Sequence, residues 1–172
     1  MDDVGHPYER LSPDVVIDAV ESRGYLSDAR ILALNSYENR VYQVGIEDQT
    51  PIIAKFYRPG RWQDEQILEE HEFTAQLLDL EVSVVPPLAD EQGCTLFTFN
   101  DFRFSLYLRQ GGQAPELDNF DHLLTIGRVI ARMHAYGKIS DFKHRPTLDI
   151  QSYAINSAKY LMSSGFIPAS LE

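Results

Sequence analysis

Two kinds of apolar spacing alternate along this chain, one typical of β-strands and the other of α-helices. Short apolar runs bounded by turn residues predict five strands, at residues 30–35, 40–46, 52–57, 94–99 and 102–108. Helical periodicity predicts helices at residues 12–23, 64–80 and 118–136, and a weaker pattern predicts another at 149–163. The strands therefore come early, with one long helix among them, and only helices follow residue 109.

This order of elements indicates an α+β fold in two lobes. Residues 1–108 are expected to form a five-stranded antiparallel sheet with the 64–80 helix, preceded by the N-terminal helix at 12–23. Residues 109–117, rich in glycine and glutamine, predict a linker between the lobes. Residues 118–172 are expected to begin a helical second lobe.

Lys55 stands inside the apolar run of the third predicted strand. Side chains of a strand alternate between its faces, so Lys55 shares one face with Ile53 and Tyr57 and is half buried there. A buried ammonium without a partner costs several kcal/mol, so it should meet a carboxylate, a ligand phosphate or both. The alternative is an edge-strand lysine whose charge reaches water along its own stem.

Glu70 favours the paired interpretation. On a helical projection of residues 64–80, the other polar side chains fall on one arc, while Glu70 lies between apolar residues on the opposite arc. The polar arc holds Glu65, Glu69, Glu72, Gln76 and Asp79, and the apolar arc holds Ile67, Leu68, Phe73, Ala75, Leu77 and Leu78. An unpaired carboxylate there would be as costly as the unpaired lysine, so the pattern predicts an ion pair between Lys55 and Glu70.

Longer strings of residues carry a resemblance to a known family. They are Leu-Asn-Ser-Tyr-Glu-Asn-Arg-Val-Tyr-Gln at 34–43, Lys-Phe-Tyr-Arg-Pro at 55–59, Arg-Trp at 61–62, Gln-Ile-Leu-Glu-Glu-His at 66–71 and His-Arg-Pro-Thr at 144–147. Together they resemble the bacterial stress response kinase A family, RdoA-type serine/threonine protein kinases with the fold of aminoglycoside phosphotransferases and choline kinases. The resemblance implies a protein-kinase-like small lobe followed by the first helices of a helical large lobe.

The resemblance also implies ligands and roles for particular residues. It implies ATP and Mg2+ as cofactors and a serine or threonine of another protein as the phosphate acceptor. Lys55 would hold the nucleotide phosphates and Glu70 would orient Lys55. Tyr107 and Leu108 would begin the hinge, where backbone groups bind adenine, although a plain linker between lobes explains them equally well.

Ser36 and Asn39 depart from the usual kinase phosphate loop. No glycine occurs between Arg30 and Val44, whereas such loops use several to bring backbone close to phosphate. A hydroxyl and a carboxamide donate hydrogen bonds to phosphate oxygens, so Ser36 and Asn39 are expected to replace the glycines. Without the resemblance, the same residues would be interpreted as an ordinary turn.

The catalytic loop implied by the resemblance, His-Gly-Asp-x-His-x-x-Asn, does not occur in these 172 residues. His144 and Arg145 begin a similar string, but Pro146 stands where a kinase has aspartate. We therefore expect the catalytic base and the Mg2+ ligands outside this chain, and no catalytic residue or metal ligand within it. A metabolite kinase of the same fold and a non-catalytic nucleotide-binding or interaction module remain as alternatives.

Composition narrows the partners. The net charge of −11 argues against a nucleic-acid partner, because duplex binding depends on Lys and Arg neutralising phosphates. Cys94 is the single cysteine, and no apolar run approaches 18 residues, so we expect no membrane partner and a cytoplasmic location.

The 118–136 helix carries an apolar stripe that suggests a contact with another molecule. Leu123, Ile126, Ile130 and Met133 share one side of it, and in this chain they are expected to face water. Exposed apolar patches tend to bind something, so a dimer through this helix is expected. His134 of the same helix is expected to be a packed core histidine.

Overall fold

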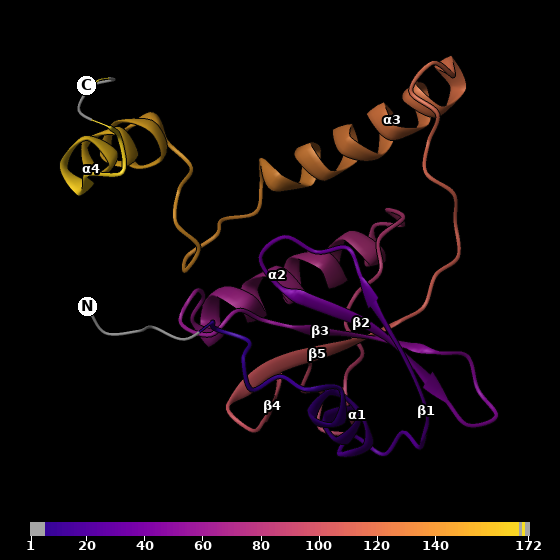
Figure 1. Ribbon diagram of the computed structural model, residues 1–172. Helices are drawn as coiled ribbons and strands as arrows, with labels where there is room; N and C mark the ends of the chain where they lie inside the picture. Colours follow the sequence, from indigo (N-terminus) through magenta and orange to yellow (C-terminus); the bar gives the residue numbers. More distant parts are fainter. Residues whose placement is uncertain (1–5, 169, 171–172) are drawn as a thin grey trace. The chain divides into compact units, whose positions relative to one another are not determined.

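The computed structural model describes residues 6–168 and residue 170, and the chain divides into two compact units, Met1–Phe142 and Lys143–Glu172. The first unit holds five strands in one antiparallel sheet of order β1-β2-β3-β5-β4 (Figure 1). The strands are β1 Ser27–Leu34, β2 Arg40–Ile46, β3 Ile52–Phe56, β4 Phe97–Phe99 and β5 Phe102–Leu108. Its helices are α1 Pro13–Glu21, α2 Asp64–Asp79 and α3 Phe120–Gly137. The predicted α+β class with a five-stranded antiparallel sheet is confirmed.

One face of the sheet forms the main core with α1. Buried side chains of β3 (Ile52, Ala54 and Phe56) and of β5 (Phe102, Phe104 and Leu106) pack in one cluster with Val16, Ala19 and Val20 of α1. The helix begins where Ser12 accepts a hydrogen bond from the amide of Val15 and Pro13 occupies the first turn, as the sequence suggests. The other face of the sheet, which carries Lys55 and Tyr107, is covered by α2 (Figure 1).

Two strands, β1 and β4, differ in length from the expectation by more than one residue. β1 begins at Ser27, and its pairing with β2 shifts between Ser27 and Ile31, where Ala29 adopts a φ of 63°. A bulge of this kind interrupts the alternation from which strand ends are predicted. β4 begins only at Phe97, because Asp90 to Cys94 form a turn in which the Asp90 carboxylate accepts from the Cys94 amide at 2.8 Å.

α2 shows a narrower buried side than its apolar arc suggested. Ile67, His71 and Leu77 are its buried residues, whereas Leu68, Ala75 and Leu78 are exposed. The helix meets the sheet along the line that also includes Glu70, so the apolar residues at the margin of the arc remain in water. Leu68, Ala75 and Leu78 thus belong to the predicted apolar arc but are not part of the buried side of α2.

α3 lies outside the core. Asn119 caps it by accepting hydrogen bonds from the amides of Asp121 and His122, and none of its described residues is buried. Leu123 and Ile130 are exposed as expected, Ile126 and Met133 are half-buried, and His134 is exposed, so the predicted core histidine is wrong. The expected dimer through this helix stays a prediction.

α3 contacts α2 through its last turns. The Tyr136 ring lies 5.3 Å from the Phe73 ring, and the Tyr136 hydroxyl donates to Gln76. Arg132 donates to the carbonyl of Glu81 at 3.0 Å and to that of Leu80. These contacts lie on the side of α2 away from the sheet.

The second unit consists of a π-helical turn, Gln151–Ile155, that continues into α4, Asn156–Ser164. Gly165 ends α4 in the left-handed conformation, with a φ of 69°. The linker expected at 109–117 lies in the segment without helix or strand between β5 and α3, inside the first unit, and the boundary between lobes stays a prediction. Among the residues that the structure describes, no helix is both long and apolar enough to cross a membrane.

Candidate functional site

A cleft of about 440 Å³ opens between the second face of the sheet and α2. Its walls come from β2, β3, α2, the segment after α2 and the end of β5. The lining residues are Val41, Ile53, Lys55, Glu70, His71, Thr74, Val85, Pro87, Tyr107, Leu108 and Gln110. Apolar side chains therefore surround a small number of polar groups, as in most sites for small molecules.

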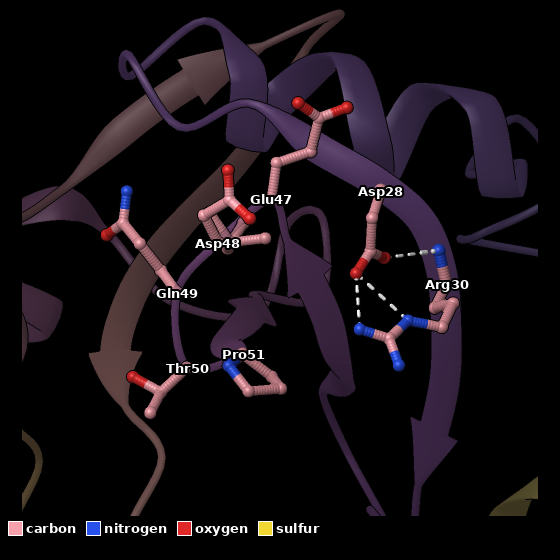
Figure 2. Close-up of a pocket in the computed structure, with 8 residues that line it drawn as sticks. Asp28, Arg30, Glu47, Asp48, Gln49, Thr50 and Pro51 are labelled. Carbon is pink, nitrogen blue, oxygen red and sulfur yellow. Dashed lines mark hydrogen bonds and ion pairs between the residues drawn. The ribbon is translucent and has the colours of Figure 1, made fainter.

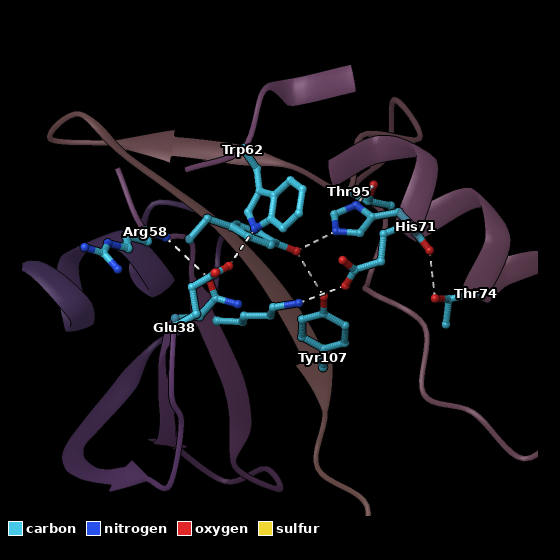
Figure 3. Close-up of polar contacts among 11 residues, drawn as sticks. Glu38, Arg58, Trp62, His71, Thr74, Thr95 and Tyr107 are labelled. Carbon is cyan, nitrogen blue, oxygen red and sulfur yellow. Dashed lines mark hydrogen bonds and ion pairs between the residues drawn. The ribbon is translucent and has the colours of Figure 1, made fainter. Parts of the chain in front are cut away.

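Lys55 and Glu70 meet in this cleft. The Lys55 Nζ donates to the Glu70 Oε1 at 2.9 Å, so the predicted pair is confirmed (Figure 3). The side chains are 21% and 35% exposed, respectively, so the pair is half-buried and open to a ligand. β3 places Lys55 directly opposite Val41 of β2 and Ser105 of β5, at the centre of the sheet.

A chain of hydrogen bonds runs behind this ion pair, and sequence reasoning missed it. The Tyr57 hydroxyl lies 2.7 Å from His71 Nε2, and His71 Nδ1 lies 2.8 Å from the Thr95 hydroxyl. The Tyr57 hydroxyl is also 3.3 Å from that of Tyr107 (Figure 3). Because hydroxyls both donate and accept, a neutral imidazole of either tautomer satisfies both contacts. Tyr57 was placed on the face of Lys55 by strand alternation, but nothing in the hydropathy pattern marked His71 as its partner.

Tyr107 closes one side of the cleft with its ring. Burial raises the pKa of Tyr107 well above its usual value, and the nearby Tyr57 hydroxyl and its hydrogen bond raise it further. Tyr107 therefore stays a neutral phenol that donates and accepts hydrogen bonds.

The loop between β1 and β2 is held by its acidic residue. The Glu38 carboxylate accepts from the Trp62 indole nitrogen at 2.6 Å (Figure 3). It also accepts from Arg61 Nε at 2.8 Å, and the Glu38 backbone carbonyl accepts from the Tyr8 hydroxyl at 2.9 Å. Burial alone would raise the pKa of Glu38, but the hydrogen bonds from Trp62 and Arg61 outweigh it and lower the pKa. Sequence reasoning assigned Glu38 no role, because a single acid in a turn carries no periodic signal.

Ser36 and Asn39 occupy the same loop. The Asn39 Oδ1 accepts from the Arg58 amide at 3.4 Å, which ties the loop to the end of β3. Neither residue is among the described residues that line the cleft. Their expected contact with phosphates stays a prediction.

A profile of the phosphotransferase enzyme family matches residues 30–165. The chain belongs to this family. Its similarity to stress response kinase A is also confirmed: proteins of that name from Escherichia coli and Shigella flexneri are 40% identical to it over the whole chain and 52% of their own length. A relative from Salmonella typhimurium, named serine/threonine protein kinase RdoA, is 36% identical over 98% of this chain and 51% of its own.

Solved phosphotransferase structures share the fold. An amicoumacin kinase in complex with AMP-PNP, Ca2+ and Ami superposes with a TM-score of 0.67, covering 89% of this chain and 48% of that one, at 20% identity. A microcompartment-associated aminopropanol kinase gives a TM-score of 0.66 over 86% of this chain and 49% of that one, also at 20% identity. The chain thus spans about half the length of the curated relatives it matches.

The end of β5 brings the expected hinge residues to the cleft. Tyr107 and Leu108 pair with Ile53 and Ile52 of β3, and Tyr107 also bridges to Pro87. Leu108 is 52% exposed and lies at the cleft mouth. Four of the six site residues expected from the sequence, Lys55, Glu70, Tyr107 and Leu108, therefore line one cleft.

A second hollow, of about 770 Å³, lies at the bulged end of β1 (Figure 2). Three of its eight lining residues are acidic, Asp28, Glu47 and Asp48, and Asp28 is already paired with Arg30. The hydrogen bonds from Arg30 lower the pKa of the Asp28 carboxyl. Across the described ranges 6–168 and 170, no three His, Cys, Asp or Glu side chains lie close enough together to hold a metal ion.

Proposed function

We propose that this chain forms the nucleotide-binding lobe of an ATP-dependent serine/threonine protein kinase of the stress-response type. The observation that carries the proposal is the Lys55–Glu70 ion pair at 2.9 Å inside an apolar cleft. A half-buried ammonium already oriented by a carboxylate offers one charged donor to an anionic ligand, and polyphosphate is the anion that phosphotransferases bind. The name of the relatives at 40% identity, stress response kinase A, supports the stress-response type, and the name of the relative at 36% identity, serine/threonine protein kinase RdoA, supports a protein as phosphate acceptor.

In this proposal, different residues of the cleft contact the adenine and the phosphates of ATP. Val41, Ile53 and Leu108 would contact the faces of adenine, and the backbone at Tyr107 and Leu108 would bind its edge. Lys55 would contact the phosphates while Glu70 keeps its ammonium pointing into the cleft. Ser36 and Asn39 would close over the phosphates from the β1–β2 loop.

Mg2+ is implied by the resemblance, but the described residues do not provide its site, since no suitable group of side chains gathers there. The proposal places the metal ligands and the catalytic base in sequence outside this chain, consistent with relatives that are about twice as long.

A small hydroxylated or amino metabolite is the second candidate for the phosphate acceptor. The two solved structures with the same fold are named as kinases of amicoumacin and aminopropanol. Both candidates use the same nucleotide cleft, so the nucleotide test below supports either of them.

Equilibrium binding of ATP to the purified 172-residue chain tests the shared part of the proposal. Lys55→Met removes the phosphate contact and should weaken ATP binding about ten- to hundredfold, the effect of losing a charge-assisted hydrogen bond of about 1.5–3 kcal/mol. Lys138→Met, which neutralises an exposed lysine after α3, is the matched control and should leave the affinity unchanged. A chain that binds no ATP, or binds it equally well without Lys55, contradicts the proposed function.

A transfer assay tests where the catalytic groups lie. The 172-residue chain, incubated with Mg2+ and ATP labelled at the γ-phosphate, should transfer no label to protein or small-molecule acceptors above background. Turnover that disappears in Lys55→Met would show that the catalytic groups are within this chain and would overturn their proposed placement.

A further inference from the structure

The buried hydrogen-bond chain Thr95–His71–Tyr57 lies directly behind the ion pair of the cleft, and the proposed function gives it no role. Tyr57 is 2% exposed and His71 is 4% exposed. Buried hydroxyl and imidazole groups are costly without partners, and here each satisfies the other at 2.7 Å. The two residues come from different elements, Tyr57 from the end of β3 and His71 from α2.

Tyr57 and His71 are each also a neighbour of one member of the ion pair. Tyr57 follows Lys55 by two residues on the same face, and the Lys55 Nζ lies 4.8 Å from the centre of the Tyr57 ring. An ammonium at this distance from an aromatic face is attracted to it. His71 follows Glu70 in α2, so a bond that holds His71 also limits the movement of the helix turn carrying Glu70.

We propose that Tyr57 and His71 are positioning residues that hold the Lys55 ammonium at the phosphate end of the cleft. The Tyr57 ring supports the ammonium from one side while Glu70 binds it from another. The hydrogen bond to His71 fixes the Tyr57 ring and joins the end of β3 to α2. It therefore keeps a constant distance between the strand that carries Lys55 and the helix that carries Glu70. This inference rests on the proposed function, because it assumes that Lys55 contacts phosphate.

The proposed role affects the contact with the phosphates of ATP and leaves the contact with its adenine base unchanged. Lys55 would touch only phosphates, so loosening its support should weaken ATP binding and leave adenosine binding unchanged. A general loss of packing in the lobe would weaken both. The ratio of the two affinities therefore distinguishes a positioning role from a structural one.

Tyr57→Phe is the first variant, since it deletes only the hydroxyl and keeps the ring beneath Lys55. We expect ATP to bind about three- to tenfold more weakly, the range for losing one hydrogen bond, with adenosine affinity unchanged. Tyr42→Phe is the matched control: Tyr42 pairs with Ala54 on the opposite face of the sheet, and its loss of a hydroxyl should change neither affinity.

Two substitutions at His71 test its two hydrogen bonds, to Tyr57 and to Thr95, one at a time. The amide of His71→Gln reaches the position of Nε2 and retains the bond to Tyr57, whereas the shorter His71→Asn reaches the position of Nδ1 and retains only the bond to Thr95. His71→Gln should keep ATP affinity within about twofold of the wild type, and His71→Asn should resemble Tyr57→Phe.

A double-variant cycle provides a second readout, which works even if adenosine binds too weakly to be measured. In a Lys55→Met background, Tyr57→Phe should have no further effect on ATP affinity, because the group it positions is gone. Equal losses for ATP and adenosine, an unchanged ATP affinity in Tyr57→Phe, or an undiminished effect in the Lys55→Met background would each overturn the proposal. If the wild type binds ATP and Lys55→Met binds it more weakly, any of these three results overturns the positioning role but leaves the proposed function standing. If the wild type binds no ATP, the positioning role and the proposed function are both contradicted.

Discussion

Removing either member of the Lys55–Glu70 pair should destabilise the first unit by an amount that reflects half-burial. At 2.9 Å, two unit charges attract each other by about 1.4 kcal/mol in a dielectric of about 80 and by about 6 kcal/mol in one of about 20. Desolvation and ordering of the side chains offset much of this attraction. Exposures of 21% and 35% place the pair between surface pairs, worth about 0.2–1 kcal/mol, and buried pairs, whose disruption costs about 3–5 kcal/mol.

We therefore expect Lys55→Met and Glu70→Gln each to lower the free energy of unfolding by about 1–2 kcal/mol, and the double variant to lower it by clearly less than their sum. The measurement is urea unfolding followed by the fluorescence of Trp62, the only tryptophan, which lies in the same unit. For a fully buried pair we would expect each single variant to lose more free energy of unfolding, so the half-burial seen in the structure reduces the expected loss.

Glu72→Gln is the matched control for this cycle. It removes the same charge from an exposed position two residues along α2, so it should show no coupling to Lys55→Met. An interaction energy between Lys55 and Glu70 below about 0.3 kcal/mol, which is the limit of additivity for independent sites, would refute the reasoning. Lys55 would then be a lysine whose charge is satisfied by water.

Three further predictions concern groups outside the ion pair. Ser105→Ala removes a buried hydroxyl without a hydrogen-bond partner among the described residues, so the unfolding midpoint in urea should stay the same or rise; a loss of more than about 1 kcal/mol would contradict this. Glu38→Gln should cost about 1 kcal/mol and shift the emission of Trp62. The pKa of Glu38 is lower in the folded state than its unfolded value of 4.5, so ionised Glu38 stabilises the fold above pH 4.5, and this stabilisation is lost as pH falls through the folded pKa. The Tm of Glu38→Gln should therefore fall less on acidification than the Tm of the wild type. Gly45→Ala would place a Cβ 2.1 Å from the Asp28 Oδ1 and should cost about 1–3 kcal/mol, most of which Asp28→Ala should restore; an additive double variant would argue against the clash.

The ion pair was predictable because it resolves an inconsistency within the sequence. A lysine in an apolar strand and a glutamate on the apolar side of the next helix each break a local pattern, and one contact removes both violations. The strand alternation that placed Ile52, Ala54 and Phe56 against the core followed from the period of two alone. Neither argument required knowledge of how distant segments pack.

The hydrogen-bond chain at His71 was not predictable in the same way. Its members Thr95, His71, Tyr57 and Tyr107 come from four separate segments, and none of them breaks its local pattern. A histidine or tyrosine is tolerated at the surface and in the core, so residue type alone does not place it. The exposed side of α2 illustrates the same limit, because Leu68 and Leu78 look like core residues until the line of contact with the sheet is known.

The sequence by itself determined the elements, the antiparallel sheet and the pairing of Lys55 with Glu70, because periodicity and the cost of burying a charge act over short stretches of chain. The tertiary structure decided the bulge in β1, the clamp on Glu38 and the support behind Lys55. The bulge arises where β1 pairs with β2, and Glu38 meets Arg61 and Trp62 across more than 20 residues. The support behind Lys55 includes a contact between residues 50 apart along the chain. Such contacts form only when separate segments pack together.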